Sequence, residues 1–368
     1  MRDFGGAIAL PRAMFTAPIT PAFAPTSHKG LTYPFGGAEP DAHGVMPVAP
    51  GIGWVRLHVP GPLKHVNCWL LDDDGGVALV DTGMNTTEAR DAWKALSKGP
   101  LAGVRVTQMI GTHFHPDHIG LAGWMCDKHG CPLVMTRGEW LTARMLVADA
   151  REAVPGEMLA FWRGAGWDEA QIAHASERGW AGFRRIVTPL PLGYTRIQHG
   201  DTLRIGQTEW QIVVGSGHSP EHACLYDPAA KVLIAGDQVL PRISPNISLG
   251  VTEPAADPLG EWFESIARLK QLPDDLLVLP GHGDPFTGLH ARLDAMDREH
   301  RERLDELEVF LAEPKRAIDC FGRLFRRAIG PDMLGMATGE ALAHVRRLEV
   351  EGRAVRSFED GVWWWRVP

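Results

Sequence analysis

The chain has few cysteines, no long apolar run and no excess of positive charge, and each of these absences excludes a class of protein. Only five of its 368 residues are cysteine (Cys68, Cys126, Cys131, Cys224 and Cys320). They are too few and too scattered for a disulfide framework, so we expect buried apolar side chains. No stretch of about eighteen apolar residues is present, which excludes a transmembrane helix. Residues 1–10 lack the charged start and apolar core of a secretory signal, and we therefore expect a cytoplasmic protein.

The charge balance argues against nucleic acid as the main partner. Lys and Arg number 37 and Asp and Glu 45, which gives a net charge of −8. Residues 315–368 differ, with ten basic residues against seven acidic ones. Contact with nucleic acid through this segment therefore stays open as the less favoured alternative, with candidate residues Arg346, Arg347, Arg353 and Arg356.

Length and composition are those of a globular protein with more than one structural unit. Residues 1–50 are rich in Pro and Gly and form an expected N-terminal arm, and residues 51–289 show the strands and helices of a catalytic domain. Within that domain, residues 139–185 carry aromatic residues at helical spacing. They predict two or three helices, either an ordinary insertion or a cap over the active site.

The remaining residues predict a linking helix and a small terminal unit. Residues 290–314 form one long helix whose apolar stripe could face its own sheet or a second copy in a homodimer. Residues 315–368 predict a helix over Lys315–Ile329, a helix over Thr338–Glu351 and then a hairpin. Helix, helix and two-stranded ribbon is the order of a winged helix.

The strongest chemical signal is His113-Phe114-His115-Pro116-Asp117-His118, directly after a predicted strand. Imidazoles and carboxylates are the ligands of a borderline cation such as Zn²⁺. His218, Asp237 and His282 each follow an apolar strand and have glycine beside them. Because glycine allows a sharp turn at a strand end, these residues predict a metal centre at one edge of a sheet.

The order H-x-H-x-D-H, then His, Asp and His, resembles the metallo-β-lactamase superfamily over about Gly53–Leu289. Asp81, in Leu79-Val80-Asp81-Thr82-Gly83, is similar to the second-strand motif of that family. The last 54 residues resemble the winged-helix-like domain of a branch that includes lactamase-like endoribonucleases and glyoxalase II-like proteins. The resemblance implies an α/β (α+β) fold, a four-layer αβ/βα sandwich with a helical insertion.

The resemblance also implies a ligand set for two zinc ions, with iron or manganese as alternatives. His113, His115 and His218 would hold the first ion, and Asp117, His118 and His282 the second. Asp237 would bridge the ions, and Asp81 would hold the metal loop by hydrogen bonds.

The implied reaction is hydrolysis by a metal-bridging hydroxide, with Asp117 and Asp237 as the catalytic residues. The acidic body and the apolar cap favour a small ester, thioester or lactone as substrate. The alternatives are a metal-dependent endoribonuclease of the same fold, a mononuclear iron persulfide dioxygenase and a non-catalytic winged-helix regulator. One branch of zinc β-lactamases has cysteine where this chain has Asp237, which disfavours antibiotic degradation.

The sequence also suggests residues around the centre. Arg242, near Asp237, is either an anchor for a substrate carboxylate or phosphate or part of a surface ion pair. Aromatic candidates to line a substrate pocket are Trp140, Trp162, Trp167 and Tyr194. His222 could support the centre or cap a strand, and His65 and Asn67 could approach the pocket from a strand edge.

Overall fold

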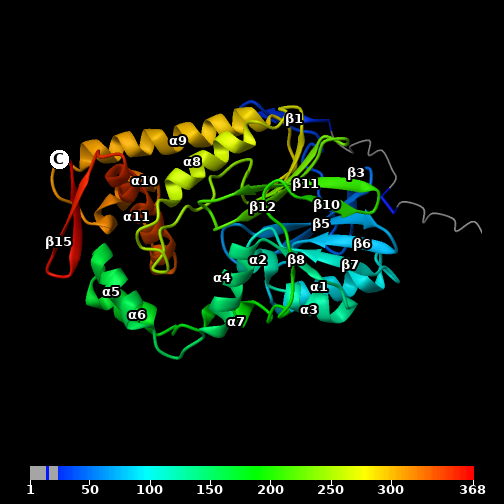
Figure 1. Cartoon of the computed structure of the whole chain (residues 1–368), viewed down its shortest axis with the longest axis horizontal. Coiled ribbons are helices and arrows are strands. Elements are labelled where there is room, and N and C mark those ends of the chain that lie inside the picture. Colours follow the sequence, from blue (N-terminus) through cyan, green and yellow to red (C-terminus); the bar gives the residue numbers. More distant parts are fainter. Residues whose placement is uncertain (1–13, 16–23) are drawn as a thin grey trace, which may run out of the picture.

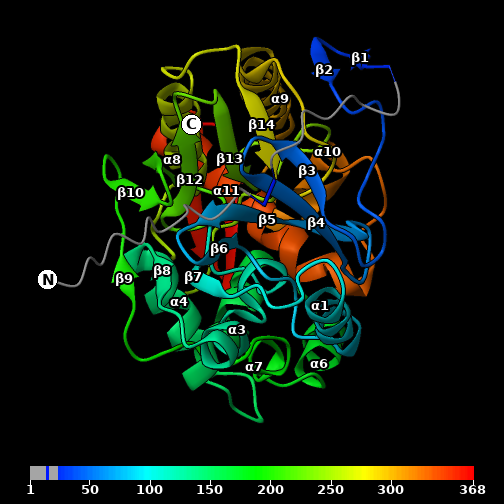
Figure 2. The ribbon, with the colours of Figure 1, turned by 90° about the vertical axis from the view of Figure 1, so that its right-hand side faces the viewer.

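The computed structural model of the chain describes residues 14–15 and 24–368. Two β-sheets lie face to face, and helices cover the outer side of each (Figure 1). The view in Figure 2 shows the same layers from the side, with α1 and α3 beyond one sheet and α8 and α9 beyond the other. The predicted four-layer αβ/βα sandwich is therefore confirmed.

The first sheet has seven strands in the order β3-β4-β5-β6-β7-β8-β9. Strands β3 to β6 pair antiparallel, and β6 to β9 pair parallel. The strands are β3 (Met46–Ala49), β4 (Ile52–His58), β5 (His65–Asp73), β6 (Gly76–Val80), β7 (Val106–Ile110), β8 (Leu133–Met135) and β9 (Thr195–Arg196).

Helices α1 (Thr87–Lys98) and α3 (Ala122–His129) cover the outer face of this sheet. Helix α1 begins where the Thr86 hydroxyl accepts a hydrogen bond from the backbone N–H of Ala89. Its apolar stripe is buried against the sheet, as the spacing predicts: Ala89, Trp93 and Leu96. The one-turn helix α2 (Pro116–Ile119) follows β7 and carries half of the H-x-H-x-D-H motif.

The second sheet has five strands in the order β10-β11-β12-β13-β14. They are β10 (Thr202–Ile205), β11 (Thr208–Gly215), β12 (His222–Asp227), β13 (Val232–Gly236) and β14 (Leu277–Pro280). Helices α8 (Pro258–Leu269) and α9 (Leu289–Phe310) pack on its outer face. A separate apolar core lies between the two sheets, where the rings of Trp54 and Trp69 stack with centroids 5.9 Å apart.

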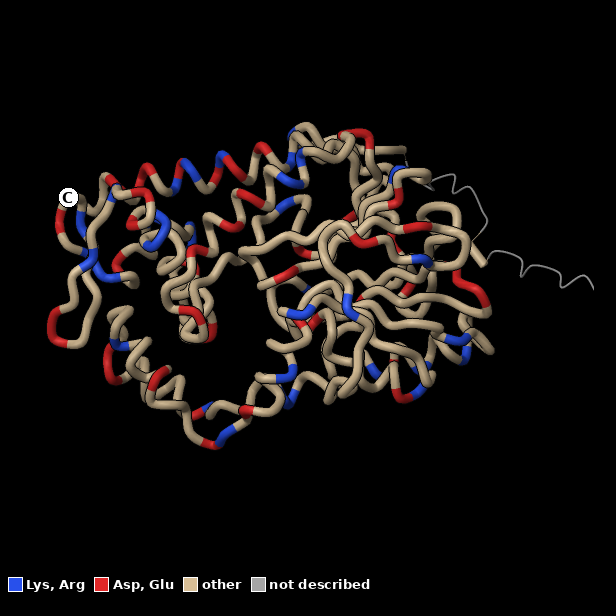
Figure 3. The backbone as a smooth tube through the Cα atoms, viewed as in Figure 1, with Lys and Arg blue, Asp and Glu red and all other residues tan. Residues whose placement is uncertain are grey.

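Helix α9 is the predicted linking helix, and its apolar stripe faces the protein interior. Leu293, Met296, Leu304 and Leu307 are all buried in the core beneath it. Basic and acidic residues alternate along its outer side (Figure 3). The apolar stripe of α9 therefore packs against the chain's own core and is not available to a second copy. A homodimer stays a prediction that would need another surface.

Residues 139–185 contain more helices than the sequence predicted. Within and beside residues 139–185 lie α4 (Arg137–Ala148), α5 (Gly156–Ala165), α6 (Glu169–Ser176) and α7 (Gly182–Ile186). The expectation of two or three helices is wrong because α5 and α6 are separate. Gly166 ends α5 in a left-handed conformation, and Asp168 starts α6 with a capping box. Figure 1 shows α5 and α6 beside the C-terminal elements.

The C-terminal segment has one long helix instead of two. The predicted helix over Lys315–Ile329 is wrong, because that stretch forms only a 3-10 helix (Ala317–Cys320) and the one-turn α10 (Phe321–Leu324). Phe325 leaves α10 in an extended conformation, and Pro331 starts a second 3-10 turn (Pro331–Met333). Helix α11 (Leu334–Val350) and the hairpin of β15 (Val355–Glu359) and β16 (Val362–Arg366) follow.

The described part of the N-terminal arm packs onto the body. Strands β1 (Thr26–His28) and β2 (Leu31–Tyr33) form a hairpin, and Thr32 pairs with Thr287 near the start of α9. Strand β3 joins the first sheet. The rest of the arm, residues 1–13 and 16–23, lies outside the described residues.

All five cysteines are buried and unbridged, as predicted. Across residues 14–15 and 24–368, no helix is both long enough and apolar enough to span a bilayer.

Candidate metal centre

The predicted ligands lie where several strands end at one edge of the two sheets. Strands β6 and β7 are parallel, and Asp81 and His113 come just after them. In the second sheet β11, β13 and β14 run in one direction, and His218, Asp237 and His282 follow their ends. This topology brings residues more than two hundred positions apart in sequence to one place.

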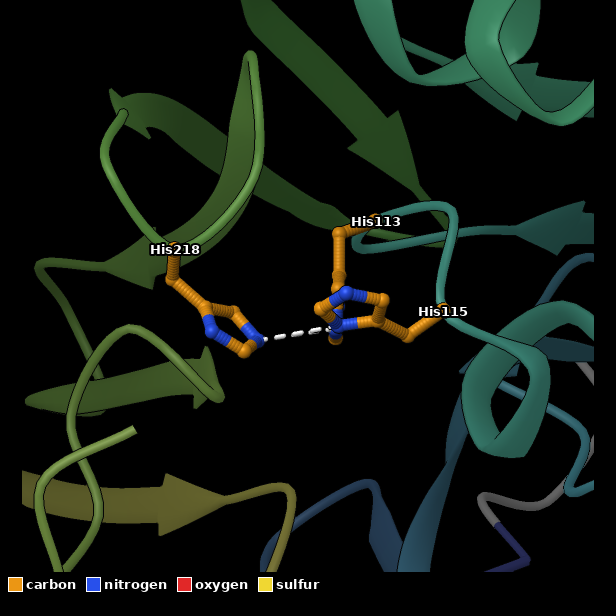
Figure 4. A group of neighbouring side chains, drawn as sticks. All are labelled: His113, His115 and His218. Atoms are coloured by element: carbon orange, nitrogen blue, oxygen red, sulfur yellow. Dashed lines mark hydrogen bonds between the residues drawn. The ribbon is translucent and has the colours of Figure 1, made fainter. Parts of the chain in front are cut away.

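Three imidazoles form the first group, and their ring nitrogens point toward one another (Figure 4). The Nδ1 atom of His115 lies 2.9 Å from Nε2 of His113 and 3.1 Å from Nε2 of His218. The Nε2 atoms of His113 and His218 are 3.3 Å apart. Two nitrogens bound tetrahedrally to one zinc ion at their normal bond length are about 3.4 Å apart, so this spacing fits one ion.

A second group contains Asp117, His118 and His282. The Asp117 carboxylate (Oδ2) lies 3.2 Å from Nε2 of His282 and 3.8 Å from Nε2 of His118. Asp237 lies between the two groups: its carboxylate oxygens are 3.4 Å from Nε2 of His118, 3.4 Å from Nε2 of His282 and 3.7 Å from Nε2 of His218. All seven predicted ligands are therefore brought together.

In His118, His218 and His282 the Nδ1 atom is held by the protein, which leaves Nε2 as the nitrogen that points inward. His218 donates from Nδ1 to the backbone carbonyl of Asn246 (2.8 Å), and His282 donates from Nδ1 to the backbone carbonyl of His65 (2.5 Å). His118 donates from Nδ1 to the Asp81 carboxylate at 2.7 Å. The Nε2 atoms are thus directed into the cluster, where they can act as ligands once a metal ion displaces their protons.

Asp81 has the supporting place that the resemblance implied. It is almost fully buried, and its carboxylate also accepts hydrogen bonds from the backbone N–H of Thr112 (2.9 Å) and from the Thr112 hydroxyl (2.7 Å). Its φ of 61° is left-handed, which is rare for a residue with a side chain. The three hydrogen bonds keep Asp81 in this conformation and join the β6 and β7 ends of the centre.

Three buried polar atoms of the cluster have no hydrogen-bond partner among the described residues: His118 Nε2, Asp237 Oδ1 and His282 Nε2. A buried polar atom without a partner costs about 1–3 kcal/mol. All three atoms face the same space and are lone-pair donors, so a cation would satisfy them together. The donor set of imidazole nitrogens and carboxylate oxygens fits zinc.

The electrostatics divide the cluster into two halves. Burial and neighbouring imidazoles hold the pKa of His113 well below its usual range, and burial together with His218 lowers the pKa of His115 to about 3. Burial also opposes charge on His282, but Asp237 and Asp117 raise the pKa of His282 to about 10. The carboxylates of Asp117 and Asp237 therefore stabilise positive charge beside them, which protons or metal ions can supply.

Two glycines are required for the close approach of the loops. A Cβ atom at Gly281 would lie 2.2 Å from Oδ1 of Asp237, and one at Gly236 would lie 2.6 Å from the ring of His222. Both distances are impossible for real side chains. The glycines beside the predicted ligands therefore give room to the neighbouring ligand loops.

The three additional polar candidates support the centre without entering it. His222 Nε2 accepts a hydrogen bond from the backbone N–H of Asp237 at 3.1 Å. His65 Nε2 accepts one from the backbone N–H of Gly283 at 3.1 Å. The Asn67 amide donates to the carbonyls of Pro280 and Gly283, both at 2.8 Å. His65 and Asn67 thus hold the loop that carries His282.

Glu139, which the sequence analysis did not single out, joins the two loops of the three-imidazole group. Its fully buried carboxylate accepts hydrogen bonds from the N–H of Phe114 (2.8 Å), the hydroxyl of Ser219 (2.6 Å) and the N–H of Glu221 (2.7 Å). Burial raises the pKa of Glu139 to about 7 against the effect of these donors. The signal in the sequence is a glutamate in the first turn of a helix, which is weak because acidic residues are common there.

The candidate substrate residues have different surroundings. The rings of Trp140 and Tyr194 are partly exposed and stack with centroids 4.5 Å apart. The exposed Arg242 has its guanidinium 5.4 Å from the Tyr33 ring centroid. Trp162 and Trp167 are buried and stacked on one another, and the Trp167 indole donates to the Thr338 hydroxyl of α11 at 2.8 Å. We leave this second pair out of the substrate site because both rings serve packing.

The arginines of the C-terminal segment face carboxylates of the chain itself. Arg347 pairs with Asp257 (2.7 Å) and Glu351 (2.9 Å), and Arg353 pairs with Asp305 and Glu308 (each 2.6 Å). Arg346 and Arg356 lie 3.2 Å and 3.7 Å from the carboxylate of Glu349. All four arginines therefore lie beside carboxylates of the chain itself.

Comparison with known proteins gives matches over most of the chain. The family model described as the metallo-beta-lactamase superfamily matches residues 61–282. The model described as the metallo-beta-lactamase-like C-terminal domain matches residues 304–368. The second match covers the end of α9, residues 311–333, α11 and the β15–β16 hairpin.

Individual proteins are similar over comparable lengths. The crystal structure of a beta-lactamase domain protein from Burkholderia ambifaria superimposes with a TM-score of 0.84, at 36% identity over 92% of this chain and 98% of that one. The probable metallo-hydrolase YqjP of Bacillus subtilis is 26% identical over 83% of this chain and 94% of its own length. The acyl-coenzyme A thioesterase MBLAC2 of Gallus gallus is 26% identical over 65% of this chain and 80% of its own.

Proposed function

Because the chain belongs to the metallo-beta-lactamase superfamily, we propose that it is a dinuclear zinc hydrolase acting on a small ester, thioester or lactone. The observation that carries this proposal is the convergence of seven ligand side chains, three of which direct unpartnered buried atoms into one space. A thioester is the first substrate class to test, because one similar protein is named as a thioesterase.

Divalent ions in this site would supply Lewis acidity, which acidifies water toward neutral pH and polarises a carbonyl oxygen. His113, His115 and His218 would hold one ion, and Asp117, His118 and His282 the other, with Asp237 shared. The protein keeps these groups in place through Asp81, Glu139 and the loop carbonyls, so little reorganisation is needed during reaction.

Asp117 is the more exposed of the two candidate catalytic carboxylates. Its side chain is 13% exposed, whereas that of Asp237 is 8% exposed. Burial would raise its pKa, but the imidazoles of His118 and His282 lower the pKa of Asp117 to about 2. It is therefore ionised at neutral pH and can orient a water molecule by accepting a hydrogen bond from it. Trp140, Tyr194 and Arg242 remain our candidates for substrate contact, as partly or fully exposed groups.

A hydrolysis screen tests the proposal. Zinc-reconstituted protein is assayed against acyl thioesters, lactones, β-lactams and RNA, with the metal-stripped protein and His115→Ala as controls. We expect turnover of an ester, thioester or lactone that disappears in both controls. Turnover of RNA alone, or one iron ion per chain with no zinc, would replace the proposal with one of the alternative activities.

A further inference from the structure

The loop after Asp237 connects the metal centre to the C-terminal segment. Residues 238–249 lead from β13 across the end of the sheet and reach α11. Figure 1 shows α11 below α9 and beside α8, next to the two-sheet body. The loop carries Asn246, whose carbonyl accepts the Nδ1–H of the candidate ligand His218 at 2.8 Å. The position of this loop therefore decides how the His218 ring is oriented.

Two lines of hydrogen bonds tie this loop to one turn of α11. In the first, the side-chain amide of Asn246 donates to the Glu340 carboxylate at 2.9 Å, while the backbone carbonyl of Asn246 accepts from His218. Burial raises the pKa of Glu340, whose side chain has the Asn246 amide as its hydrogen-bond partner. The contact is thus partly buried.

The second line runs through two buried histidines, and its direction can be deduced. His344 donates from Nδ1 to the backbone carbonyl of Glu340 at 2.8 Å, so its Nε2 must accept. His300 of α9 therefore donates from Nδ1 to Nε2 of His344 at 3.2 Å. The Ser244 hydroxyl then donates to Nε2 of His300 at 2.9 Å. Through His300 and His344, Ser244 is thereby linked to the same turn of α11 that Asn246 contacts.

Helix α11 also approaches the loop backbone closely. The N–H of Leu249 donates to the carbonyl of Gly339 at 3.0 Å, and a Cβ atom at Gly339 would lie 2.7 Å from the Ser248 hydroxyl. The loop is therefore seated on α11 by side chains and backbone together.

We propose that the C-terminal segment is a positioning element of the metal centre: Glu340 anchors Asn246, and the Asn246 carbonyl orients His218 as a zinc ligand. Asn246 and Glu340 are positioning residues, because neither reaches the space between the ligands. Loss of such an outer hydrogen bond lowers metal affinity by about 10- to 100-fold. The inference rests on the metal centre of the proposed function and not on its substrate.

A double-mutant cycle on these two residues tests the inference. Zinc affinity of the metal-stripped full-length protein is measured by competition with a chromophoric chelator, together with thermal unfolding of the metal-free form. Asn246→Asp places a second carboxylate against Glu340, and we expect about a 10-fold loss of zinc affinity. Glu340→Gln keeps an acceptor for the Asn246 amide and should bind zinc within about threefold of the native chain. The double variant reverses donor and acceptor, and we expect it to regain most of the lost affinity.

Glu351→Ala is the matched control. This carboxylate of α11 accepts hydrogen bonds from Arg347 and Arg353 and has no contact with the loop among those described. We expect its zinc affinity to be unchanged even if the metal-free protein is less stable.

The results separate this inference from the proposed function. If Asn246→Asp binds zinc as tightly as Glu351→Ala, or if the double variant regains nothing, the positioning role is refuted and the metal centre stands. If the native chain binds no zinc, the metal centre itself is refuted, and this inference with it. If Asn246→Asp fails to fold, Asn246→Ala and Ser244→Ala remove the two lines of hydrogen bonds one at a time. Zinc affinity equal to that of the native chain in both variants would then refute the inference.

Discussion

Glu139→Gln should separate the two loops that carry the three-imidazole group. In the native chain, one carboxylate oxygen accepts from Ser219 and Glu221 and the other from Phe114. A carboxamide has one accepting oxygen and one NH₂ group, so whichever way it turns, at least one backbone N–H faces a donor. The variant keeps the volume of the side chain and changes its hydrogen bonding and its charge, and it is compared with the native chain at pH 8, above the Glu139 pKa of about 7, where the carboxylate is ionised.

The size of the effect follows from the lost bond. A hydrogen bond to a charged group contributes about 1.5–3 kcal/mol, and a buried unpaired N–H costs a similar amount. Because Glu139 is fully buried, we expect the free energy of unfolding of the metal-free protein to fall by about 2–4 kcal/mol. Zinc affinity should fall as well, since Phe114 lies between two ligands.

Urea unfolding of the metal-free protein and a zinc titration measure the two effects. Glu221→Gln is the matched control, because the Glu221 carboxylate accepts one hydrogen bond, from the N–H of Gly138, which a glutamine oxygen can keep. If both variants unfold at the same urea concentration and bind zinc equally, Glu139 does not hold the two loops together.

Three other predictions concern the same centre and its support. Asp81→Asn should lower zinc affinity by about 10- to 100-fold, measured by chelator competition, because its single amide oxygen cannot accept from both the Thr112 backbone N–H and His118, which bond different oxygens of the native carboxylate; unchanged affinity would contradict this. His115→Ala and Asp237→Ala should abolish turnover and reduce bound metal while circular dichroism stays native; full activity in either would remove the mechanism. Burial lowers the pKa of His344 to about 4 from an ordinary 6.5, so the unfolded chain takes up this proton first as pH falls. Between pH 7 and pH 5 the native chain should lose about 2 kcal/mol more stability than His344→Gln in urea unfolding, and parallel losses would show that His344 is not buried as a neutral ring.

The sequence could predict the layered fold and the convergence of the ligands. The ligands follow apolar strands, and strands that run in one direction end at one edge of a sheet, so the spacing of His113, His218 and His282 carries spatial information. Asp81 was identified by its resemblance to the second-strand motif of the family, and it lies at the end of β6 next to β7. The family resemblance supplied the order in which these ends meet.

The rest depends on tertiary contacts that no local pattern encodes. Trp162 and Trp167 have the helical spacing of a pocket lining, yet they pack against α11, more than 160 residues later in the chain. Residues 315–329 have helical composition, but Phe325 turns away and Leu324 is buried beneath α9 and α11. Glu139 is recognisable only when the loops at Phe114 and Ser219 are seen on either side of it.

Zinc stoichiometry tests the central claim most directly. The metal-stripped protein is titrated with zinc in a calorimeter, and bound metal is counted by elemental analysis after gel filtration. The account predicts two zinc ions per native chain and fewer in His115→Ala. The account would be contradicted if the native chain retained no zinc, or if it retained no more zinc than a variant that lacks both His115 and His282.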